Sequence, residues 1–574
     1  MDKWKKPLFK VKSVDTFVDQ LLESRGIEVA DADDYLDTTK KKLHNPYLMK
    51  DMKLAVNRII QAIQNNEKIG ILGDYDCDGV TSTSVLVQVL NELGAEVVYF
   101  VPDRQLDGYG VNKRGIDFMQ NNSVVLCITC DTGITAVEQV DDMKSRGIDV
   151  IVTDHHEPKP ADSYEDKVIP LGLQVGEYLI PKCTAVVNMK RPDCKYPFKG
   201  LAGVGVAFKV LCAVAEKIHP EKRKLVYKYF DLVALGTVAD MMDMHDENRV
   251  IVYHGLRRLN RTKNRGLHQL IRATGLKDKE LTSQDIGWTL APTINAAGRI
   301  VSAEQAVDMV ISDNRLDAYR YAQELVEVNL QRKELTKTYV KAIIDSIEAD
   351  DTNESIIVHY YPAIPEGIIG LIAGRVTNHF NRPCIVVSDG DHPGIVKGSG
   401  RSIEALNMFE TLMHYTDIIN FGGHHMACGL SMQKDDFDQF KHSLEFYVDT
   451  ILSEKDLSKE THVDCEITPE HITMELLEEL AILEPFGNGY KKPVFLLKNA
   501  LILKEKPVGD DKNHLWALIK AGNKTFSSIG FFIYEDYAGL GNPKKVDLLF
   551  MPDLNEYPAG KFNVQLKIEA VRKA

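Results

Sequence analysis

Between residues 68 and 154 the chain alternates short apolar runs with segments of about a dozen residues that predict helices, and this alternation restricts the fold more than any other feature. The apolar runs are KIGILGD (68–74), AEVVYFV (95–101), SVVLCITCD (123–131) and IDVIVTD (148–154), and TSTSVLVQVLNELG (81–94) and TAVEQVDDMKSRG (135–147) lie between them. Strands that are apolar along their whole length and joined by helices form parallel sheets covered on both faces. The pattern therefore predicts a doubly wound α/β domain.

Changes in composition along the chain predict the remaining organisation. Residues 1–65 are expected to form a charged, mostly helical lead-in to the α/β domain, which spans 66–314 and becomes helical from about 200. Residues 315–350 contain no Gly or Pro and predict one long connecting helix, a semi-rigid spacer. A second, smaller α/β domain is predicted over 351–457. Short β-rich runs separated by turn residues over 458–574 predict a small antiparallel barrel or sandwich.

Composition limits the class of protein. The chain has 574 residues, no apolar run long enough to span a membrane, and no apolar segment at its start that resembles a secretory signal. Its nine cysteines are scattered, which argues against a disulfide framework and favours the reducing cytoplasm. The net charge of −14 argues weakly against nucleic-acid binding, but residues 488–574 hold 14 Lys and Arg against 9 Asp and Glu, a surplus of 14 − 9 = 5.

Carboxylates and imidazoles recur where the predicted strands end. In open parallel sheets these ends meet at one edge, where ligands bind. Oxygen ligands with one or two imidazoles suit Mn²⁺ or Mg²⁺, and a divalent cation offsets the repulsion between crowded carboxylates. With this many acids we expect two ions, bridged by a carboxylate and a water. The residues are Asp74, Asp76 and Asp78 after the first run, Asp131 after the third, Asp154, His155 and His156 after the fourth, and Asp240 and Asp243 after a later apolar stretch.

Single pieces of this pattern have simpler interpretations. A D-x-D-x-D turn is often a solvated loop or a calcium site, although Ser84 and Val85 stand where an EF-hand needs glutamate. A His-His pair is often structural, and Asp243 is interpreted as an exposed acid. Cys127 and Cys130 form a C-x-x-C without a second pair at zinc spacing, so we interpret them as core residues.

The motifs as a set resemble one known superfamily. GDYDCDG, CDTGI, TDHH and TVADMM, in this order, resemble the four motifs of the DHH phosphoesterases. EGIIGLIAGRV, GSGRS and FGGHHMACG resemble the DHHA1 domain of that superfamily. LAGVGVAFK, PTINAAGRI and EPFGNGYKKPVF are similar to the bacterial RecJ single-stranded-DNA exonucleases, and the resemblance runs from about residue 45 to the end.

The resemblance implies roles for the acidic cluster. The metal ligands it implies are Asp76, Asp78, Asp131, His155 and Asp240, with Asp74 at a further acidic position of the family. Asp131 is the candidate for the carboxylate that bridges the ions, and Asp154 is expected to orient His155 without touching the metal. His156 is expected to contact the scissile phosphate or the leaving oxygen, so Asp131, His155 and His156 are the predicted catalytic residues.

Glycine-rich segments and arginines farther along the chain predict phosphate contacts. Gly-rich turns let backbone N–H groups approach phosphate oxygens, and Arg binds such oxygens bidentately. The glycines could instead only form tight turns, and Arg299 could instead serve a salt bridge. The predicted phosphate-binding residues are Arg299, Ser399, Gly400, Arg401, Gly422, Gly423 and His424, and the C-terminal aromatics considered for base stacking are Trp516, Phe526, Phe531 and Phe532.

The implied activity is a 5′→3′ exonuclease that releases 5′-mononucleotides from single-stranded DNA by two-metal-ion hydrolysis, in recombination and repair. The resemblance further implies a single-strand-binding protein and a helicase as partners, and we expect a cytoplasmic monomer without membrane contact. Two alternatives stay open. The first is a DHH enzyme that acts on short oligonucleotides, cyclic dinucleotides or pyrophosphate, and the second is a non-catalytic nucleic-acid-binding scaffold.

Overall fold

The computed structural model describes residues 3–104, 106–349, 354–390, 392–509, 511–555 and 562–574. Two compact units divide the chain: Lys40–Ser458 forms one, and Met1–Thr39 together with Lys459–Ala574 forms the other. None of the helices within these described ranges is long and apolar enough to cross a membrane.

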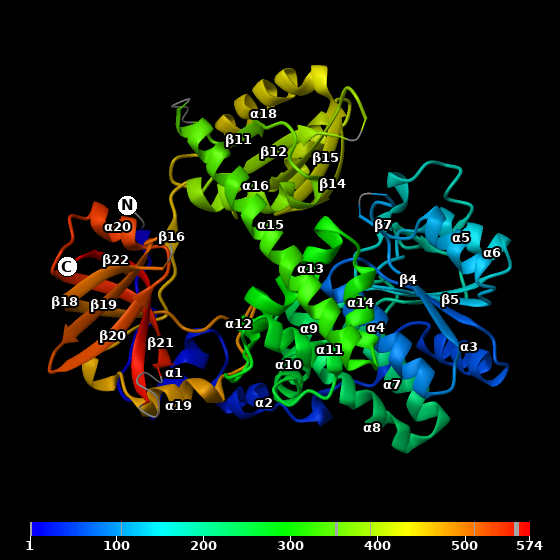
Figure 1. Cartoon of the computed structure of the whole chain (residues 1–574), viewed down its shortest axis with the longest axis horizontal. Helices are drawn as coiled ribbons and strands as arrows, with labels where there is room; N and C mark the ends of the chain where they lie inside the picture. The colour runs from blue at the N-terminus through cyan, green and yellow to red at the C-terminus, as the bar shows by residue number, and fades with distance from the viewer. Residues whose placement is uncertain (1–2, 105, 350–353, 391, 510, 556–561) are drawn as a thin grey trace. The chain divides into compact units, whose positions relative to one another are not determined.

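The larger unit begins with a five-stranded parallel sheet in the order β10-β6-β5-β3-β4 (Figure 1). Its strands are β3 (Ile69–Leu72), β4 (Val97–Phe100), β5 (Leu126–Cys130), β6 (Asp149–Thr153) and β10 (Ala185–Val187). One apolar core packs α3 (Met52–Gln64), α4 (Cys77–Glu92) and α7 (Gly203–Ile218) on one face, and a second packs α5 (Lys113–Asn121) and α6 (Val137–Ser145) on the other. The predicted doubly wound sheet is confirmed.

Buried helices follow this sheet and support its acidic edge. Helix α9 (Phe230–Ala239) is apolar on all sides, as expected of a helix in the centre of a core. It packs against α4 and against α10 (Asp246–Leu259). A π-helical turn, η7 (Ile286–Leu290), leads directly into α13 (Ala291–Ile300).

The predicted long helix is α15 (Arg315–Ala349); residue 350 lies outside the described residues. One side of the helix is buried, and it packs against α11 (Arg265–Ala273), α13, α14 (Glu304–Ile311) and α16 (Glu366–Phe380). The buried side chains include Ala318, Ala322, Leu325, Ile343 and Ile347. The helix is therefore part of the packed core of its unit rather than a bare spacer.

A second sheet follows in the order β11-β12-β13-β15-β14, parallel between its first two strands and antiparallel elsewhere. The strands are β11 (Ile357–Tyr360), β12 (Cys384–Asp389), β13 (Ile395–Arg401), β14 (Ile419–His424) and β15 (Ala427–Gln433). Helices α15 and α16 cover one face, and α18 (Phe437–Ile451) covers the other. This is the second α/β domain expected from the sequence.

The smaller unit contains a closed barrel in which β18 pairs with both β19 and β21, giving the ring β18-β19-β20-β22-β21. The strands are β18 (Phe495–Val508), β19 (His514–Ala521), β20 (Lys524–Gly530), β21 (Lys545–Asn555) and β22 (Asn563–Lys573). A neighbour order of 1-2-3-5-4 is that of a five-stranded Greek-key barrel of the oligonucleotide-binding type. The barrel predicted from the β-rich runs is confirmed.

The predicted lead-in over 1–65 divides between the two units. Strand β2 (Phe9–Lys10) pairs with β17 (Cys465–Glu466), which in turn pairs with β18, so the first residues extend the barrel sheet. Residues from Lys40 onward belong to the larger unit, where α3 packs under the parallel sheet. Strands as short as β2 and β17, which pair with segments distant in the sequence, produce no periodic pattern of their own. The sequence therefore did not indicate this division.

Candidate metal centre and phosphate pocket

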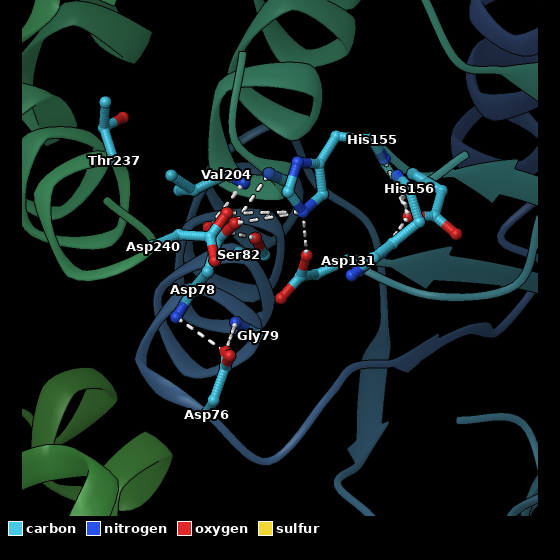
Figure 2. A network of polar contacts seen from close by, with 12 residues as sticks. Asp76, Asp78, Gly79, Ser82, Asp131, His155, His156, Val204, Thr237 and Asp240 are labelled. Atoms are coloured by element: carbon cyan, nitrogen blue, oxygen red, sulfur yellow. Dashed lines mark hydrogen bonds and ion pairs between the residues drawn. The ribbon is translucent and has the colours of Figure 1, made fainter. Parts of the chain in front are cut away.

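Four stretches of chain bring acids and imidazoles to one place (Figure 2). Strand β3 leads into the first acidic motif, β5 into Asp131, and β6 into Asp154, His155 and His156, while α9 ends at Asp240. The three strands are neighbours in the sheet, so their carboxyl ends lie at the same edge. The structure thus assembles the residues that were singled out by their positions after predicted strands.

Backbone N–H groups of two helices orient the acids of the first motif. Asp76 is the N-cap of α4, and its Oδ1 accepts hydrogen bonds from the backbone of Asp78 (2.9 Å) and Gly79 (3.0 Å). The two oxygens of Asp78 accept from Gly203 (2.6 Å) and Val204 (2.8 Å) at the N-terminus of α7. Helix N-termini stabilise carboxylates. Each carboxylate retains lone pairs for a cation.

The His155 ring lies among three carboxylates. Its Nε2 is 3.1 Å from Asp131 Oδ1, 3.5 Å from Asp240 Oδ2 and 3.9 Å from Asp78 Oδ2. Burial, followed by the charge of His156, lowers the pKa of His155 to about 3, so the ring is neutral at physiological pH. A neutral imidazole is the form that binds a metal ion.

Three sets of ligand atoms could each hold a divalent cation, because all atoms within a set lie within 4.8 Å of one another. Asp131 belongs to two of these sets, and so does His155. Sharing of this kind is what a carboxylate that bridges two ions requires. The sets are Asp131 with His155 and His156, Asp78 with His155 and Asp240, and Asp74 with Asp76 and Asp131.

The electrostatics of the cluster favour a cation. Burial, with the nearby charge of Asp76, raises the pKa of Asp74 well above its usual range, and burial with the charge of Asp78 does the same for Asp131. Burial and Asp76 raise the pKa of Asp78 to about 7, and burial and Asp78 raise that of Asp240 to about 8. A divalent cation would offset the desolvation and the repulsion that cause these shifts.

Buried carboxylate oxygens without hydrogen-bond donors in the described part of the chain show that the residues fit a divalent cation. Asp74 Oδ1, Asp131 Oδ1 and Asp240 Oδ2 are buried carboxylate oxygens that accept no hydrogen bond from any described residue. Buried polar atoms without partners are rare in folded proteins and indicate a missing ligand. Oxygen and imidazole donors in this number suit Mn²⁺ or Mg²⁺.

Asp154 has a different partner from the one expected. Its Oδ1 accepts a hydrogen bond from Nδ1 of His156 (2.8 Å) and contacts His155 only through the backbone N–H (2.7 Å). The backbone of Ile134 holds the other oxygen at 2.9 Å. Asp154 therefore orients the ring of His156, whereas the prediction named the ring of His155. The two histidines are adjacent, and only the path of the chain after β6 decides which ring turns back toward Asp154.

The same contact sets the charge of His156. Burial lowers its pKa, but the charge and hydrogen bond of Asp154 outweigh burial and raise the pKa to about 9. Nε2, the other ring nitrogen, lies 3.3 Å from the hydroxyl of Tyr109. His156 is therefore a cation at neutral pH, with one N–H directed away from Asp154.

Asp154→Asn is expected to move the alkaline limit of activity to lower pH. The amide cannot supply the charge that raises the pKa of His156, so this pKa should fall from about 9 toward the ordinary value near 6.5. Because the imidazolium exists only below its pKa, kcat should fall from neutral pH upward, by about 10- to 100-fold at pH 8. pH–rate profiles with saturating Mn²⁺ measure this. Asp162→Asn, an exposed control, should keep the original profile, and an unmoved alkaline limb in Asp154→Asn would refute the assignment.

A pocket of 460 Å³ in the same compact unit gathers the predicted arginines. Arg299 donates from Nη1 to the carbonyl of Gly367 (2.9 Å), and Arg401 donates to Ser399 Oγ (2.9 Å). The partner of Arg299 in this contact is a backbone carbonyl, so its alternative role in a salt bridge gains no support. The lining includes Arg104, Arg299, Glu366, Gly370, Lys397, Ser399, Arg401, Phe421, Gly422 and Gly429.

The predicted glycine-rich turn is instead a pair of strands. Gly422 in β14 pairs with Gly429 in β15, and a Cβ at either position would meet nothing within 4 Å. Both line the pocket, so the missing side chains keep its wall open. A Cβ at Gly423 would lie 2.3 Å from a backbone oxygen, which gives this glycine a structural role. Gly400, Gly423 and His424 do not line the pocket.

Comparison with known proteins identifies the family. The DHH family N-terminal domain matches residues 68–237, the DHHA1 domain matches 353–450 and the RecJ OB domain matches 463–570. The single-stranded-DNA-specific exonuclease RecJ of Bacillus subtilis is 36% identical over 556 residues, covering 96% of this chain and 68% of the relative. RecJ of Haemophilus influenzae is 31% identical over 573 residues, covering 96% of each.

The chain belongs to the RecJ family. It is accordingly a metal-dependent hydrolase of the DHH superfamily. Crystal structures of RecJ from Thermus thermophilus match it with TM-scores of 0.79 for the Mn²⁺ complex and 0.72 for the Mg²⁺ complex, at 26% identity. The Mn²⁺ complex covers 97% of this chain, which covers 75% of that one. The alternative of an enzyme for short or cyclic oligonucleotides is not supported, because the barrel matches the RecJ OB domain.

Several residues of the site were not predicted. Gly203 and Val204 orient Asp78 through their backbone, Asn295 accepts from the backbone of Cys77 (2.7 Å), and Tyr109 approaches His156. Gly203 and Asn295 lie in segments that carried the RecJ resemblance, LAGVGVAFK and PTINAAGRI. Their place within these motifs could have drawn attention to Gly203 and Asn295. Their backbone and amide contacts could not be predicted, because these contacts depend on the fold.

Proposed function

We propose that this chain hydrolyses single-stranded DNA from the 5′ end and releases 5′-mononucleotides. The observation that carries the proposal is the presence of a metal-binding cluster and an arginine-lined pocket within one compact unit. A metal centre that cuts one phosphodiester bond, together with a pocket that binds another phosphate, suits a substrate strand that is held by its end. The curated relatives are described as single-stranded-DNA-specific exonucleases.

The centre would hold two ions, Mn²⁺ or Mg²⁺, which are the ions in the Thermus RecJ structures. When bound, such ions lower the pKa of a water that attacks phosphorus and offset charge on the phosphate oxygens. We assign Asp131 to the position between the ions. The full set of proposed ligands is Asp74, Asp76, Asp78, Asp131, His155 and Asp240.

His156 adds a positive charge beside the centre. Asp154 holds the ring through Nδ1, so Nε2, which lies 3.3 Å from the hydroxyl of Tyr109, is the nitrogen that would reach the substrate. With a pKa of about 9 the ring is protonated at neutral pH. Its Nε2–H can donate to a phosphate oxygen or to the departing 3′ oxygen, and this hydrogen bond strengthens as negative charge develops.

The arginine pocket would bind the 5′-terminal phosphate. Arg104 lines the pocket and stands 5.3 Å from the ring centroid of Tyr75, the residue between Asp74 and Asp76, so the pocket adjoins the acidic cluster. Arg299 and Arg401 supply planar donors suited to phosphate oxygens. A terminal phosphate held here would place the next phosphodiester toward the metals, which explains release of single nucleotides from one end.

The barrel would bind the strand beyond the cutting site. Lys506 lies 5.2 Å from the Trp516 ring, and both belong to neighbouring strands of the barrel. Phe526 is buried and cannot stack on a base, whereas Phe531 and Phe532 are exposed after the end of β20. Base stacking on such exposed rings tolerates any sequence.

We place the chain, as a monomer, in the cytoplasm beside a helicase and a single-strand-binding protein, where recombination and repair supply single strands. All nine cysteines are free thiols, which suits a reducing compartment. The domain assignments proposed with this function are 66–314 for the chemistry, 351–457 together with Arg104 and Arg299 for the terminal phosphate, and 458–574 for the strand.

A substrate comparison tests the proposal. With Mn²⁺, hydrolysis should be fastest on 5′-phosphorylated single-stranded DNA, and the products should be mononucleotides. Blunt duplex, dinucleotides and pyrophosphate should be poor substrates. A 5′-hydroxyl strand should show a KM at least about tenfold higher, because hydrogen bonds between charged groups are lost in the pocket. A preference for dinucleotides or pyrophosphate would overturn the exonuclease assignment.

A further inference from the structure

Trp288 is the most exposed large apolar side chain among those that the structure describes, with 80% of its surface open to solvent. It lies in the π-helical turn η7 (Ile286–Leu290). A π-turn widens a helix by one residue and is frequent at functional sites. An exposed tryptophan leaves a large aromatic face in water, whereas the same ring buried in a core would stabilise the fold.

The π-turn connects the two halves of the site. A Cβ at Gly287 would lie 4.0 Å from Val238 of α9, the helix that ends at Asp240. On its other side, η7 continues directly into α13, which carries Arg299 of the pocket. Trp288 therefore lies in a turn that packs on the helix ending at Asp240 and begins the helix leading to the phosphate pocket.

A second exposed apolar residue follows the last residue of the metal cluster in the chain. Met241 directly follows Asp240 and has 69% of its surface exposed. Its φ of 54° lies in the left-handed region, which is rare for a bulky side chain. Such backbone conformations persist where the surrounding structure enforces them and often accompany function. Two independent irregularities, one in each element, thus place apolar side chains beside the end of α9.

We propose that Trp288 is a stacking platform for a nucleobase of the substrate strand near the metal centre. This inference rests on the proposed function, which fixes the phosphates of a single strand at the acidic cluster. The bases adjoining those phosphates are unpaired and present flat apolar faces, and a tryptophan ring binds such faces without regard to sequence. In a duplex these faces are already stacked, so the platform would favour single strands.

Steady-state kinetics on 5′-phosphorylated oligothymidylate test the platform. Trp288→Ala should raise KM about tenfold or more, as loss of one base stack does, while kcat at saturation stays close to that of the unchanged protein. Trp288→Phe should restore most of the affinity because it retains an aromatic face. Phe446→Ala removes an aromatic ring of similar exposure, 76%, from α18 and serves as the matched control with unchanged KM.

Fluorescence gives a readout that a merely structural role would not change. The chain has three tryptophans, Trp4, Trp288 and Trp516, so a Trp4→Phe, Trp516→Phe double variant leaves Trp288 as the only indole. In an Asp131→Asn background, oligothymidylate should quench this fluorescence. A series of oligonucleotides with one abasic site at each successive position should lose the quenching at one position near the 5′ end.

The outcomes separate this inference from the proposed function. If the unchanged protein cleaves single strands but Trp288→Ala keeps its KM, or if quenching is the same for every abasic position, then no base stacks on Trp288. If the unchanged protein cleaves no single strand, the proposed function fails first, and the kinetic comparison shows this directly.

Discussion

Asp131→Asn is expected to lower the rate of single-strand hydrolysis by about 10³-fold or more, while binding of single-stranded DNA remains close to that of the unchanged protein. Asp131 is shared between two candidate ligand sets, and its Oδ1 lies 3.1 Å from Nε2 of His155. If Asp131 holds both ions as proposed, loss of its anionic oxygen would weaken the binding of each. Transition-state stabilisation by metal ions is worth several kcal/mol, and each 1.4 kcal/mol is about tenfold in rate. Binding should persist because the phosphate pocket and the barrel do not use this carboxylate.

Asparagine is the appropriate replacement because of the backbone at this position. Asp131 has φ 60°, a left-handed conformation that Asn tolerates better than Ala does. Turnover of 5′-labelled strands, Mn²⁺ binding by calorimetry and DNA binding by anisotropy are the measurements. Asp162→Asn, an exposed acid, is the control that should keep all three. Near-normal turnover of Asp131→Asn would show that the metal centre lies elsewhere.

The acidic cluster could be predicted because its position follows from the topology of the sheet. Runs such as IGIL and LCITC are apolar on both faces, so the residue that ends each run must lie at the carboxyl edge of a parallel sheet. Helix 366–380 has clear boundaries in the sequence, since a proline precedes it and an asparagine, Asn381, which is left-handed in the structure, follows it.

Contacts that depend on one backbone angle could not be predicted. Asp154 contacts the ring of His156 rather than that of His155, although the two differ by one position. Strand β18 (Phe495–Val508) is continuous because Asn499 adopts φ 56° within a bulge and the chain continues in the same direction. Turn-forming residues in the sequence indicated a break there.

The roles of individual glycines were the hardest feature of the site to predict from the sequence. Gly422 and Gly423 are adjacent and were expected to act together, yet Gly422 opens the pocket while Gly423 lies against a backbone oxygen. Gly203 was part of a recognised motif without an assigned role. A glycine has no side chain to indicate what it faces, so only the packed structure distinguishes an open wall from a close approach.

Gly203→Ala is expected to reduce hydrolysis by roughly 10²-fold, because a displacement of about 1 Å in a catalytic group has that cost. A Cβ at this position would lie 2.5 Å from Asp131 Oδ1 and 2.8 Å from Asp131 Cγ. The backbone N–H of Gly203 also donates to Asp78 at 2.6 Å. The added methyl must therefore displace Asp131 or the N-terminus of α7, and either movement separates two proposed metal ligands.

Thermal stability distinguishes displacement of the proposed metal ligands from loss of folding in the variant. Alanine is intrinsically the better helix former, by about 1 kcal/mol, so the variant should fold with a melting temperature near that of the unchanged protein while its Mn²⁺ affinity falls. Gly539→Ala in α20 (Tyr534–Gly539), where a Cβ meets nothing within 4 Å, is the matched control and should keep full activity. If Gly203→Ala binds Mn²⁺ and cleaves DNA as well as this control, then Asp131 and the end of α7 are not packed together in the active enzyme. If its Mn²⁺ affinity alone is preserved while cleavage is lost, the displaced group is not a ligand, and Gly203 acts on the path of the strand instead.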